Sequence, residues 1–253
     1  MKLGGSVITD KATYRTPRLD ALARLALEVA SVGQRVVVVH GAGSFGHVLA
    51  KKHDLARGDA EAAIERRLAA AQVHADVREL QALVLSALRD VGLPAVGLST
   101  YDLARTTSGE LSNFAYEPVH ETLARGFVPV LSGDVVLDNA RGFGILSGDV
   151  LMLELARAVR PARAVFATDV DGIFDRDPRE PGATLLPRVD LRADIRESES
   201  RVPDITGSMA GKLKRARAVA ASGVPVHVVN GLAPGRVAEA LAGKRTLGTV
   251  VTA

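Results

Sequence analysis

Residues 36–47 read VVVVHGAGSFGH, a run of four valines followed by a loop that contains three glycines. Four β-branched residues in a row predict a strand that is buried on both faces, and the glycines allow a tight turn that opens directly into a helix. Such a turn points several backbone N–H groups at one place, where the helix dipole adds partial positive charge. The stretch therefore predicts a phosphate-binding loop within an α/β fold.

The composition indicates a folded globular protein with an aliphatic core, since 47% of the 253 residues are hydrophobic but only 4% are aromatic. The chain has no cysteine, which excludes disulfides, cysteine-ligated zinc, iron–sulfur clusters and thiol nucleophiles. The net charge of +3 is small and dispersed, so it does not favour nucleic acid as a partner. No apolar run approaches the ~20 residues that span a bilayer, and there is no signal-peptide core. We therefore expect a cytoplasmic protein that binds no membrane.

Apolar periodicity alternates between strand and helix along the chain. Strand patterns occupy residues 1–8 (interrupted at Gly4 and Gly5), 36–39, 95–98, 128–131, 163–167, 224–229 and 246–251. Helical spacing occupies residues 18–32, 59–91, 117–125, 151–159, 212–222 and 234–242. A small hairpin or a lid over a pocket is expected at residues 100–113, a hairpin arm at 131–138, and a charged excursion with few apolar anchors at 190–204. The alternation predicts an α/β protein, a three-layer α/β/α sandwich around a mostly parallel central sheet.

Four segments have the composition of phosphate loops: Gly4-Gly5-Ser6, Gly41–Gly46, Ser147-Gly148-Asp149 and Thr206–Gly211. Three lysines lie in or near them: Lys2, Lys11 and Lys212. Four loops suit two phosphorylated ligands, and phosphoryl transfer needs the positioning and charge neutralisation that lysines and backbone N–H groups supply. The P-loop pattern G-x-x-x-x-G-K-[ST] is absent from the sequence, so the chain is not a P-loop enzyme.

A dinucleotide site is the main alternative for the central loop, because Gly41, Gly43 and Gly46 spell G-x-G-x-x-G. That site wants a carboxylate about 20 residues further on, at the end of the next strand. Here the corresponding residues 59–67 lie inside a helical pattern, and Gly4-Gly5 already occupies the place of the first glycine loop. The sequence therefore disfavours a dehydrogenase.

Five motifs together resemble the amino acid kinase superfamily and, within it, the isopentenyl phosphate kinases. They run in order along the chain: KLGGSVITDK (2–11), VHGAGSFGH (39–47), FGILSGD (143–149), TDVDGIF (168–174) and DITGSMAGK (204–212). The resemblance implies the amino acid kinase fold as a single domain over residues 1–253. Residues 1–160 would form the lobe for the acceptor and for dimerisation, and residues 161–253 the nucleotide lobe. It also implies ATP and Mg²⁺ as cofactors, an isoprenoid monophosphate as partner and a homodimer.

The resemblance assigns roles to individual residues. Lys2 and Lys212 would flank the transferring phosphoryl group, Lys11 would stabilise the transition state, Asp149 would orient the lysines, and His47 would donate a hydrogen bond to the acceptor's phosphate. The acceptor would be cradled by Gly41, Ala42, His47 and Gly148. Gly43 would face the donor phosphates, and ATP would be bound by Lys2, Leu3, Gly4, Gly5, Ser6, Gly43, Asp169, Val170, Asp171, Gly172, Ile173, Phe174, Ser208 and Lys212. No residue is singled out as a metal ligand.

His47 is the residue that favours a phosphate acceptor. A phosphate monoester has a second pKa near ~6 and is largely ionised at pH 7, so no general base is needed, and the sequence indicates no carboxylate–histidine pair for that task. Asp134 is interpreted as a structural cap. A fosfomycin-type or other small-acid kinase of the same fold, and a non-catalytic nucleotide-binding protein, remain as alternatives. Val150 and Ser208 depart from the family pattern, and the first strand is expected to be frayed because only Met1 precedes Lys2.

Overall fold

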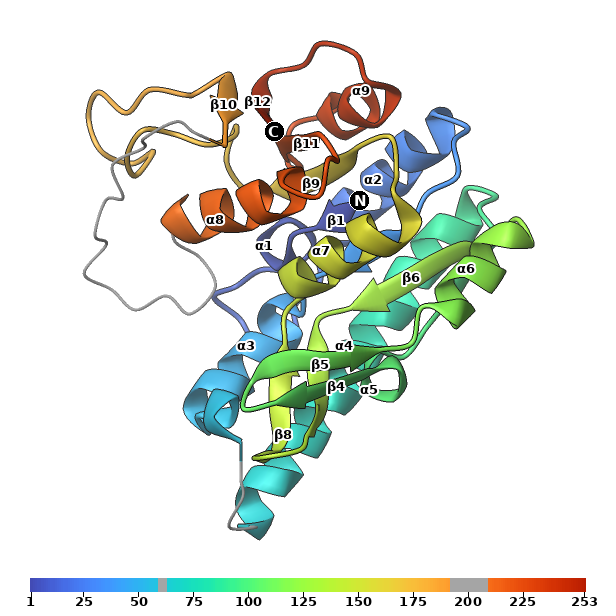
Figure 1. Ribbon diagram of the computed structural model, residues 1–253, viewed down its shortest axis with the longest axis vertical. Helices are drawn as coiled ribbons and strands as arrows, with labels where there is room; N and C mark the ends of the chain where they lie inside the picture. Colours follow the sequence, from blue (N-terminus) through green and yellow to red (C-terminus); the bar gives the residue numbers. More distant parts are fainter. Residues whose placement is uncertain (59–62, 192–208) are drawn as a thin grey trace.

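An eight-stranded sheet with the strand order β10-β12-β11-β9-β1-β2-β6-β3 forms the centre of the protein (Figure 1). We describe residues 1–58, 63–191 and 209–253 of the computed structural model. All neighbouring strands of this sheet are parallel except β11 and β12, which are antiparallel. The strands are β1 (Lys2–Leu3), β2 (Val38–His40), β3 (Ala95–Gly97), β6 (Val128–Ser132), β9 (Ala164–Thr168), β10 (Arg188–Asp190), β11 (Val226–Asn230) and β12 (Gly248–Thr252).

Helices connect these strands and cover both faces of the sheet. They are α1 (Gly5–Ile8), α2 (Leu19–Ser31), α3 (Gly43–Lys52), the 3₁₀ helix η1 (Leu55–Arg57), α4 (Ile64–Asp90), α5 (Thr100–Leu103), α6 (Glu117–Ala124), α7 (Gly148–Val159), α8 (Met209–Ala220) and α9 (Arg236–Ala242). Most predicted helices and strands are present, with ends that differ by a few residues. The prediction for residues 1–8 is wrong in its second half, because Gly5–Ile8 form helix α1 rather than strand, and the first residues of the predicted helix 59–91 lie outside the described residues.

Alternate residues of the central strands point into two separate cores. In β2, Val38 packs in the core under α2, α4 and α9, whereas Val39 packs in the core under α6, α7 and α8. Val165 and Phe166 of β9 divide in the same way. Side chains alternate between the faces of a strand, so a strand buried on both faces is apolar at every position. The arrangement confirms the predicted three-layer α/β/α sandwich with a mostly parallel sheet.

A second, four-stranded sheet, β5-β4-β7-β8, stands beside the main one. It consists of β4 (Ala104–Thr107), β5 (Glu110–Phe114), β7 (Asp134–Asp138) and β8 (Gly142–Leu146), which confirms both predicted hairpins. Between this sheet and helices α3 and α4 lies a third apolar cluster, formed by Leu55, Ala69, Ala70, Val73, Val77, Val135 and Phe143.

Strand β1 differs from its prediction. A frayed strand is expected because only Met1 precedes Lys2. The structure instead places β1 in the middle of the sheet, paired with β2 on one side and β9 on the other. Met1 is only 8% exposed, and its amino group donates a hydrogen bond to the Val37 carbonyl. Pairing on both sides and burial therefore hold a strand of only two residues in place. The expected excursion lies largely outside the described residues.

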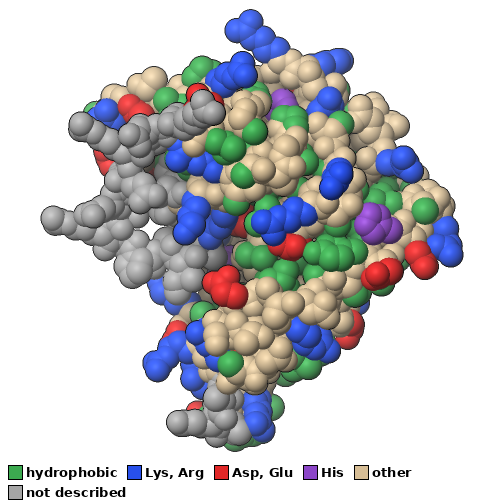
Figure 2. Space-filling view, viewed as in Figure 1, with side chains coloured by type: hydrophobic (Ala, Val, Ile, Leu, Met, Phe, Trp, Pro, Cys, Tyr) green, Lys and Arg blue, Asp and Glu red, His purple; other side chains and the backbone are tan. Residues whose placement is uncertain are grey.

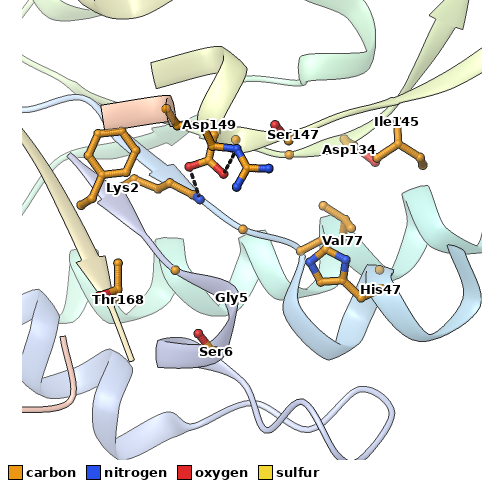
Figure 3. Close-up of a pocket in the computed structure, with 18 of the residues that line it drawn as sticks. Lys2, Gly5, Ser6, His47, Val77, Asp134, Ile145, Ser147, Asp149 and Thr168 are labelled. Atoms are coloured by element: carbon orange, nitrogen blue, oxygen red, sulfur yellow. Dashed lines mark hydrogen bonds and ion pairs between the residues drawn. The ribbon is translucent and has the colours of Figure 1, made fainter. Parts of the chain in front are cut away.

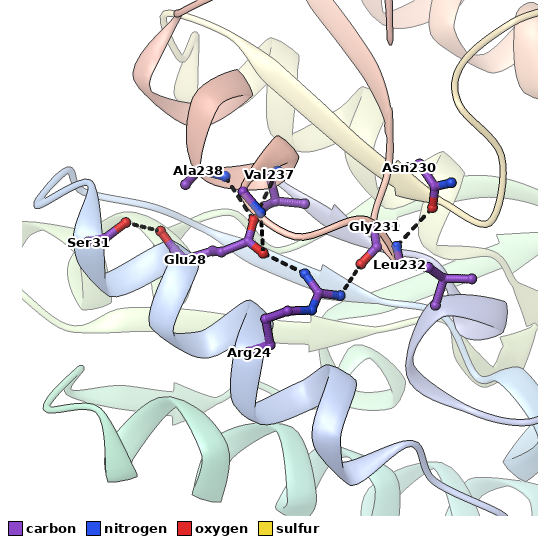
Figure 4. Close-up of polar contacts among 9 residues, drawn as sticks. Arg24, Glu28, Ser31, Asn230, Gly231, Leu232, Val237 and Ala238 are labelled. Carbon is purple, nitrogen blue, oxygen red and sulfur yellow. Dashed lines mark hydrogen bonds and ion pairs between the residues drawn. The ribbon is translucent and has the colours of Figure 1, made fainter. Parts of the chain in front are cut away.

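Glu28 joins α2 to the segment that follows β11 (Figure 4). Its carboxylate accepts hydrogen bonds from the backbone N–H groups of Gly235, Val237 and Ala238 at 3.0–3.1 Å, so it caps the first turn of α9 from another helix. Arg24 donates to the same carboxylate and to the carbonyl of Gly231. The contact connects the two ends of the chain across one face of the sheet.

In the part of the chain that the structure describes, none of the helices has the length and apolar character needed to cross a membrane. The visible face of the molecule carries Lys and Arg side chains interspersed with Asp and Glu, as the small net charge suggests (Figure 2).

Candidate active site

A cavity opens where the carboxyl ends of β1, β2 and β9 meet the first turns of α3 and α7, and its two ends differ in character. Charged side chains gather at one end: Lys2, Lys11, Asp149, Asp169, Lys212 and Arg215. Apolar side chains gather at the other: Ala50, Val73, Val77 and Ile145. Asp134 also lies there, beside Ile145 (Figure 3). Figure 3 shows Lys2 and Asp149 on one side and His47, Val77 and Ile145 on the other. The cavity therefore suits a ligand with an anionic head and an apolar tail.

The first two glycine turns are in direct backbone contact. A Cβ atom on Gly5 would lie 2.6 Å from the Cα of Gly43, and one on Gly41 would lie 2.8 Å from the N atom of Gly5. Gly43 also has a φ of +51°, which disfavours any residue with a side chain. These glycines let two chain segments approach closely enough for their backbone to line one cavity.

Asp149, in the first turn of α7, is bracketed by two cations. Its Oδ1 lies 2.6 Å from Nζ of Lys2 (Figure 3). Its Oδ2 lies 3.3 Å from Nε of Arg215. Burial lowers the pKa of Lys2, Asp149 opposes that shift, and the charges of Arg215 and Lys212 lower the pKa further. The Ser147 hydroxyl accepts a hydrogen bond from the Val150 N–H and caps the helix, which leaves the Asp149 carboxylate to the cavity.

Lys212 makes a different contact: its Nζ lies 3.1 Å from Oδ1 of Asp169, at the end of β9. Although burial raises the pKa of Asp169, the charges of Lys212 and Lys11 hold that pKa below its usual value. Because the positive charge of Lys11 lowers the pKa of Asp169, Lys11, Asp169 and Lys212 form one charge cluster. The cluster can neutralise the negative charge of phosphate groups.

The segment that carries Lys11 is anchored by the residues that follow it. The Thr16 N–H donates to the Ser44 hydroxyl at 3.2 Å, and the hydroxyl of Tyr14 donates to the buried carboxylate of Asp76 on α4. Arg15 forms an ion pair with the same carboxylate. These contacts hold the segment against α3 and α4, so that Lys11 lines the cavity although its side chain is exposed.

His47 lies on α3 and lines the cavity together with Gly41, Ala42 and Gly148. His40 ends β2 nearby. Burial lowers its pKa to about 4, and its Nδ1 lies 3.2 Å from the Gly41 carbonyl, so His40 is neutral and helps to hold the loop. His47 is therefore the histidine that faces a ligand at this loop.

Comparison with known proteins agrees with this geometry, since the amino acid kinase family matches residues 1–230. The chain belongs to the amino acid kinase family. It is 34% identical to the isopentenyl phosphate kinase of Methanothermobacter thermautotrophicus, over 100% of this chain and 98% of that protein. It is also 34% identical to the isopentenyl phosphate kinase of Thermoplasma acidophilum, over 99% and 98% of the two chains. A solved isopentenyl phosphate kinase superimposes with a TM-score of 0.86 at 32% identity, over 99% of this chain and 98% of the other.

Twelve of the residues predicted for an amino acid kinase site line the cavity: Lys2, Gly4, Gly5, Ser6, Lys11, Gly41, Ala42, His47, Gly148, Asp149, Asp169 and Lys212. Ser208 lies outside the described residues. The other seven predicted residues do not line this cavity. Gly43 packs closely against Gly5 and Thr9, and its expected place facing the donor phosphates stays a prediction.

The predicted nucleotide segment of this amino acid kinase reaches the cavity only at Asp169. Asp171 pairs with Arg236 and accepts a hydrogen bond from Asn230 at 2.9 Å. Ile173 is fully buried, and its N–H donates to the Thr249 hydroxyl. Leu3 is likewise a core residue, 3% exposed, so Leu3 and Ile173 can offer a ligand only backbone atoms. Val170, Gly172 and Phe174 are also absent from the lining of this cavity.

Sequence reasoning missed two polar features of the cavity. Arg215 lies three residues after Lys212, a helical spacing that places both side chains on one face and could have indicated it. Asp134 begins β7 and lines the cavity, with Nδ1 of His74 2.9 Å from its Oδ2. Asp134 begins a strand, so its interpretation as a cap is wrong. Asp134 and His74 also form a carboxylate–histidine pair that the sequence did not indicate. Nothing in the local sequence joins two residues that are 60 positions apart.

Proposed function

We propose that this amino acid kinase transfers the γ-phosphoryl group of ATP to isopentenyl phosphate and forms isopentenyl diphosphate. Similarity to isopentenyl phosphate kinases over the whole chain supports the proposal. The single observation that carries it from the structure is the two-ended cavity, in which a cluster of cations and an apolar compartment meet at the loop of His47. A small-acid acceptor would leave the apolar compartment without a ligand group to bury.

In the proposed reaction, an oxygen of the acceptor phosphate attacks the γ-phosphorus of ATP. A new P–O bond forms, the bond to the β–γ bridging oxygen breaks, and ADP leaves with that electron pair. The acceptor phosphate is already ionised near pH 7, so no side chain has to remove a proton. Lys2 and Lys212 flank the transferring group, Lys11 stabilises its charge, and His47 donates a hydrogen bond to the acceptor.

Magnesium would accompany the nucleotide. The described residues contain no group of three or more His, Asp or Glu side chains arranged to hold a metal ion. The carboxylates at the charged end, Asp149 and Asp169, are each engaged by cations. Magnesium commonly keeps its waters and binds through substrate phosphates and one or two carboxylates, and this donor set fits that mode. When bound, the ion would neutralise charge on the donor phosphates.

The direct test is turnover of isopentenyl phosphate with ATP and magnesium, followed by phosphorus NMR. We expect two pairs of doublets, one from ADP and one from isopentenyl diphosphate, as the singlet of isopentenyl phosphate disappears. Turnover of fosfomycin alone would instead support the small-acid kinase, and ATP binding without turnover of any acceptor would support a nucleotide-binding protein. Either result would overturn the proposal.

A second test addresses the acceptor phosphate. His47→Ala should raise the KM for isopentenyl phosphate by roughly 10- to 100-fold, because one charge-assisted hydrogen bond is lost, and should leave the dissociation constant of ATP within about twofold. His53→Ala is the matched control, since His53 follows the same helix and does not line the cavity. Equal kinetics for both variants would contradict the role of His47.

A further inference from the structure

We propose that Arg215 is a positioning residue for phosphoryl transfer. Its guanidinium fixes one oxygen of Asp149, so that the other oxygen holds Lys2 at the transferring phosphoryl group. The inference rests on the proposed function, because it concerns the same cavity. The motif DITGSMAGK, one of the five that carry the resemblance, ends at Lys212. Arg215 lies one helical turn later and is therefore not part of it.

The geometry gives each oxygen of Asp149 its own cation. Lys2 Nζ lies 2.6 Å from Oδ1, and Arg215 Nε lies 3.3 Å from Oδ2. The three side chains are only 16%, 10% and 25% exposed for Lys2, Asp149 and Arg215, so water and salt screen these charges less than at the surface. A carboxylate that is held at both oxygens cannot rotate away from Lys2. Arg215 thereby limits the positions that the Lys2 ammonium can adopt.

The helical register assigns Lys212 and Arg215 to different partners. They are three residues apart on α8 and line the same cavity, but Lys212 pairs with Asp169 at 3.1 Å. The resemblance implies that Asp149 orients Lys212 as well as Lys2. In this chain the second cation on Asp149 is Arg215. Lys212 instead pairs with Asp169, the first residue of the predicted nucleotide segment after β9.

A purely structural role is the competing explanation, because the Asp149–Arg215 pair also ties α8 to α7. That role would make an Arg215 variant less stable without changing the chemistry at Lys2. Kinetics distinguish the two explanations, because a positioning role lowers kcat in the folded enzyme whereas a structural role lowers only the free energy of unfolding. Removal of Arg215 should therefore lower kcat at temperatures where the variant is still fully folded.

Steady-state kinetics give the first test. Arg215→Gln should lower kcat by about 10- to 100-fold, the effect of misplacing a catalytic group, with both KM values within about threefold. Arg215→Lys should recover part of this loss because it keeps the charge. Lys214→Gln is the control, as it removes one exposed positive charge from the same helix. A kcat for Arg215→Gln within twofold of the unmodified enzyme would overturn the proposal.

A second readout does not depend on the acceptor. The Lys2 ammonium can be followed at fixed pH by NMR of ¹⁵N-lysine-labelled protein, with its signal assigned through Lys2→Arg. We expect the Lys2 signal to shift and its hydrogens to exchange faster in Arg215→Gln, where the contact with Asp149 is loosened, and to stay unchanged in Lys214→Gln. An unchanged Lys2 signal in both variants would contradict the inference. If the unmodified protein does not phosphorylate isopentenyl phosphate, the proposed function fails while this measurement still tests Arg215. Should Arg215→Gln fail to fold, a kcat for Arg215→Lys equal to that of the unmodified enzyme would overturn the inference.

Discussion

Nδ1 of His74 lies 2.9 Å from Oδ2 of Asp134, whose side chain is 1% exposed in the wall of the cavity. Burial raises the pKa of Asp134 from 3.8 to about 6, against the opposing effects of His74 and the Val135 N–H. The folded state therefore holds a proton at Asp134 more tightly than the unfolded state does. The resulting stabilisation is fully present below pH 3.8 and is lost as the pH rises through about 6.

Replacement of Asp134 by asparagine removes this titration. Relative to the unmodified protein, Asp134→Asn should gain up to about 3 kcal/mol in unfolding free energy between pH 4 and pH 8, the equivalent of a shift of about 2 pKa units. Urea unfolding at several pH values measures the difference in unfolding free energy between the variant and the unmodified protein. An effect of the substitution that does not depend on pH drops out when the differences at two pH values are compared. Asp138→Asn should show its effect at lower pH and with the opposite sign. Burial raises the pKa of Asp138, but backbone and Thr106 hydrogen bonds outweigh it and hold that pKa at about 2. The variant should therefore lose stability relative to the unmodified protein as the pH rises from about 2 to 4 and change little from pH 4 to pH 8. Parallel pH profiles for Asp134→Asn and the unmodified protein would contradict the prediction.

Glu28 gives a second prediction, which concerns stability. Its buried carboxylate satisfies three backbone N–H groups at the start of α9 and pairs with Arg24. Glu28→Gln keeps the shape but loses the charge and part of the acceptor capacity, so we expect a loss of about 2 kcal/mol. Glu28→Ala should cost more, because it leaves these donors and Arg24 without their carboxylate.

Urea midpoints at constant m-value would measure these losses. Glu121→Gln is a suitable control, since Glu121 is 66% exposed and its pair with Arg125 should contribute little. A loss for Glu28→Gln no larger than that for Glu121→Gln would show that the contact between α2 and α9 does not stabilise the fold.

The sequence was sufficient to predict the layers of the fold because their signals are local. A run such as residues 36–39 has the apolar pattern of a doubly buried strand. Gly41 marks the turn after this run, and Gly4-Gly5 marks the turn after the neighbouring strand β1. The antiparallel pairing of β11 with β12 was not predictable, because strand direction depends on how the chain returns to the sheet rather than on composition.

The cavity was predictable where one motif carries both the backbone turn and the functional side chain, as at Lys2, His47 and Asp149. It was not predictable where a contact joins distant elements. The Arg215–Asp149 pair depends on how α8 packs against α7, and the His74–Asp134 pair depends on how α4 lies along β7. Such relationships need the relative placement of helices, which periodicity alone does not provide.

Gly43 gives a third prediction. A Cβ atom there would lie 2.1 Å from Oγ1 of Thr9 and 2.9 Å from the Gly5 carbonyl oxygen, at a φ of +51°. Gly43→Ala should therefore cost more than about 3 kcal/mol and disturb both phosphate loops. Gly33→Ala is the control, because Gly33 has a φ of +62° with open space around it and should cost only about 1 kcal/mol. Thermal unfolding compares them, and equal losses would contradict the close packing of the two turns.

The apolar end of the cavity gives a fourth prediction, on acceptor length. Val77 of α4 is fully buried, belongs to the apolar cluster between α4 and the second sheet, and lines the cavity. Val77→Ala would enlarge this compartment, so it should weaken the use of isopentenyl phosphate and improve that of the longer geranyl phosphate. Because methylene-sized changes in a pocket are worth about 1–3 kcal/mol, the ratio of the two kcat/KM values should rise by roughly tenfold or more.

Val84→Ala separates the effect of the enlarged compartment from a general loss of stability. Val84 is 1% exposed on the same helix, but it packs in the core under α2 and α9 and not against the cavity. Both substitutions should destabilise the protein by a similar amount, since each removes the same buried methyl groups. Only Val77→Ala should change the ratio of kcat/KM for geranyl phosphate to that for isopentenyl phosphate. If both variants kept the ratio of the unmodified enzyme, the apolar end of the cavity would not hold the acceptor's tail.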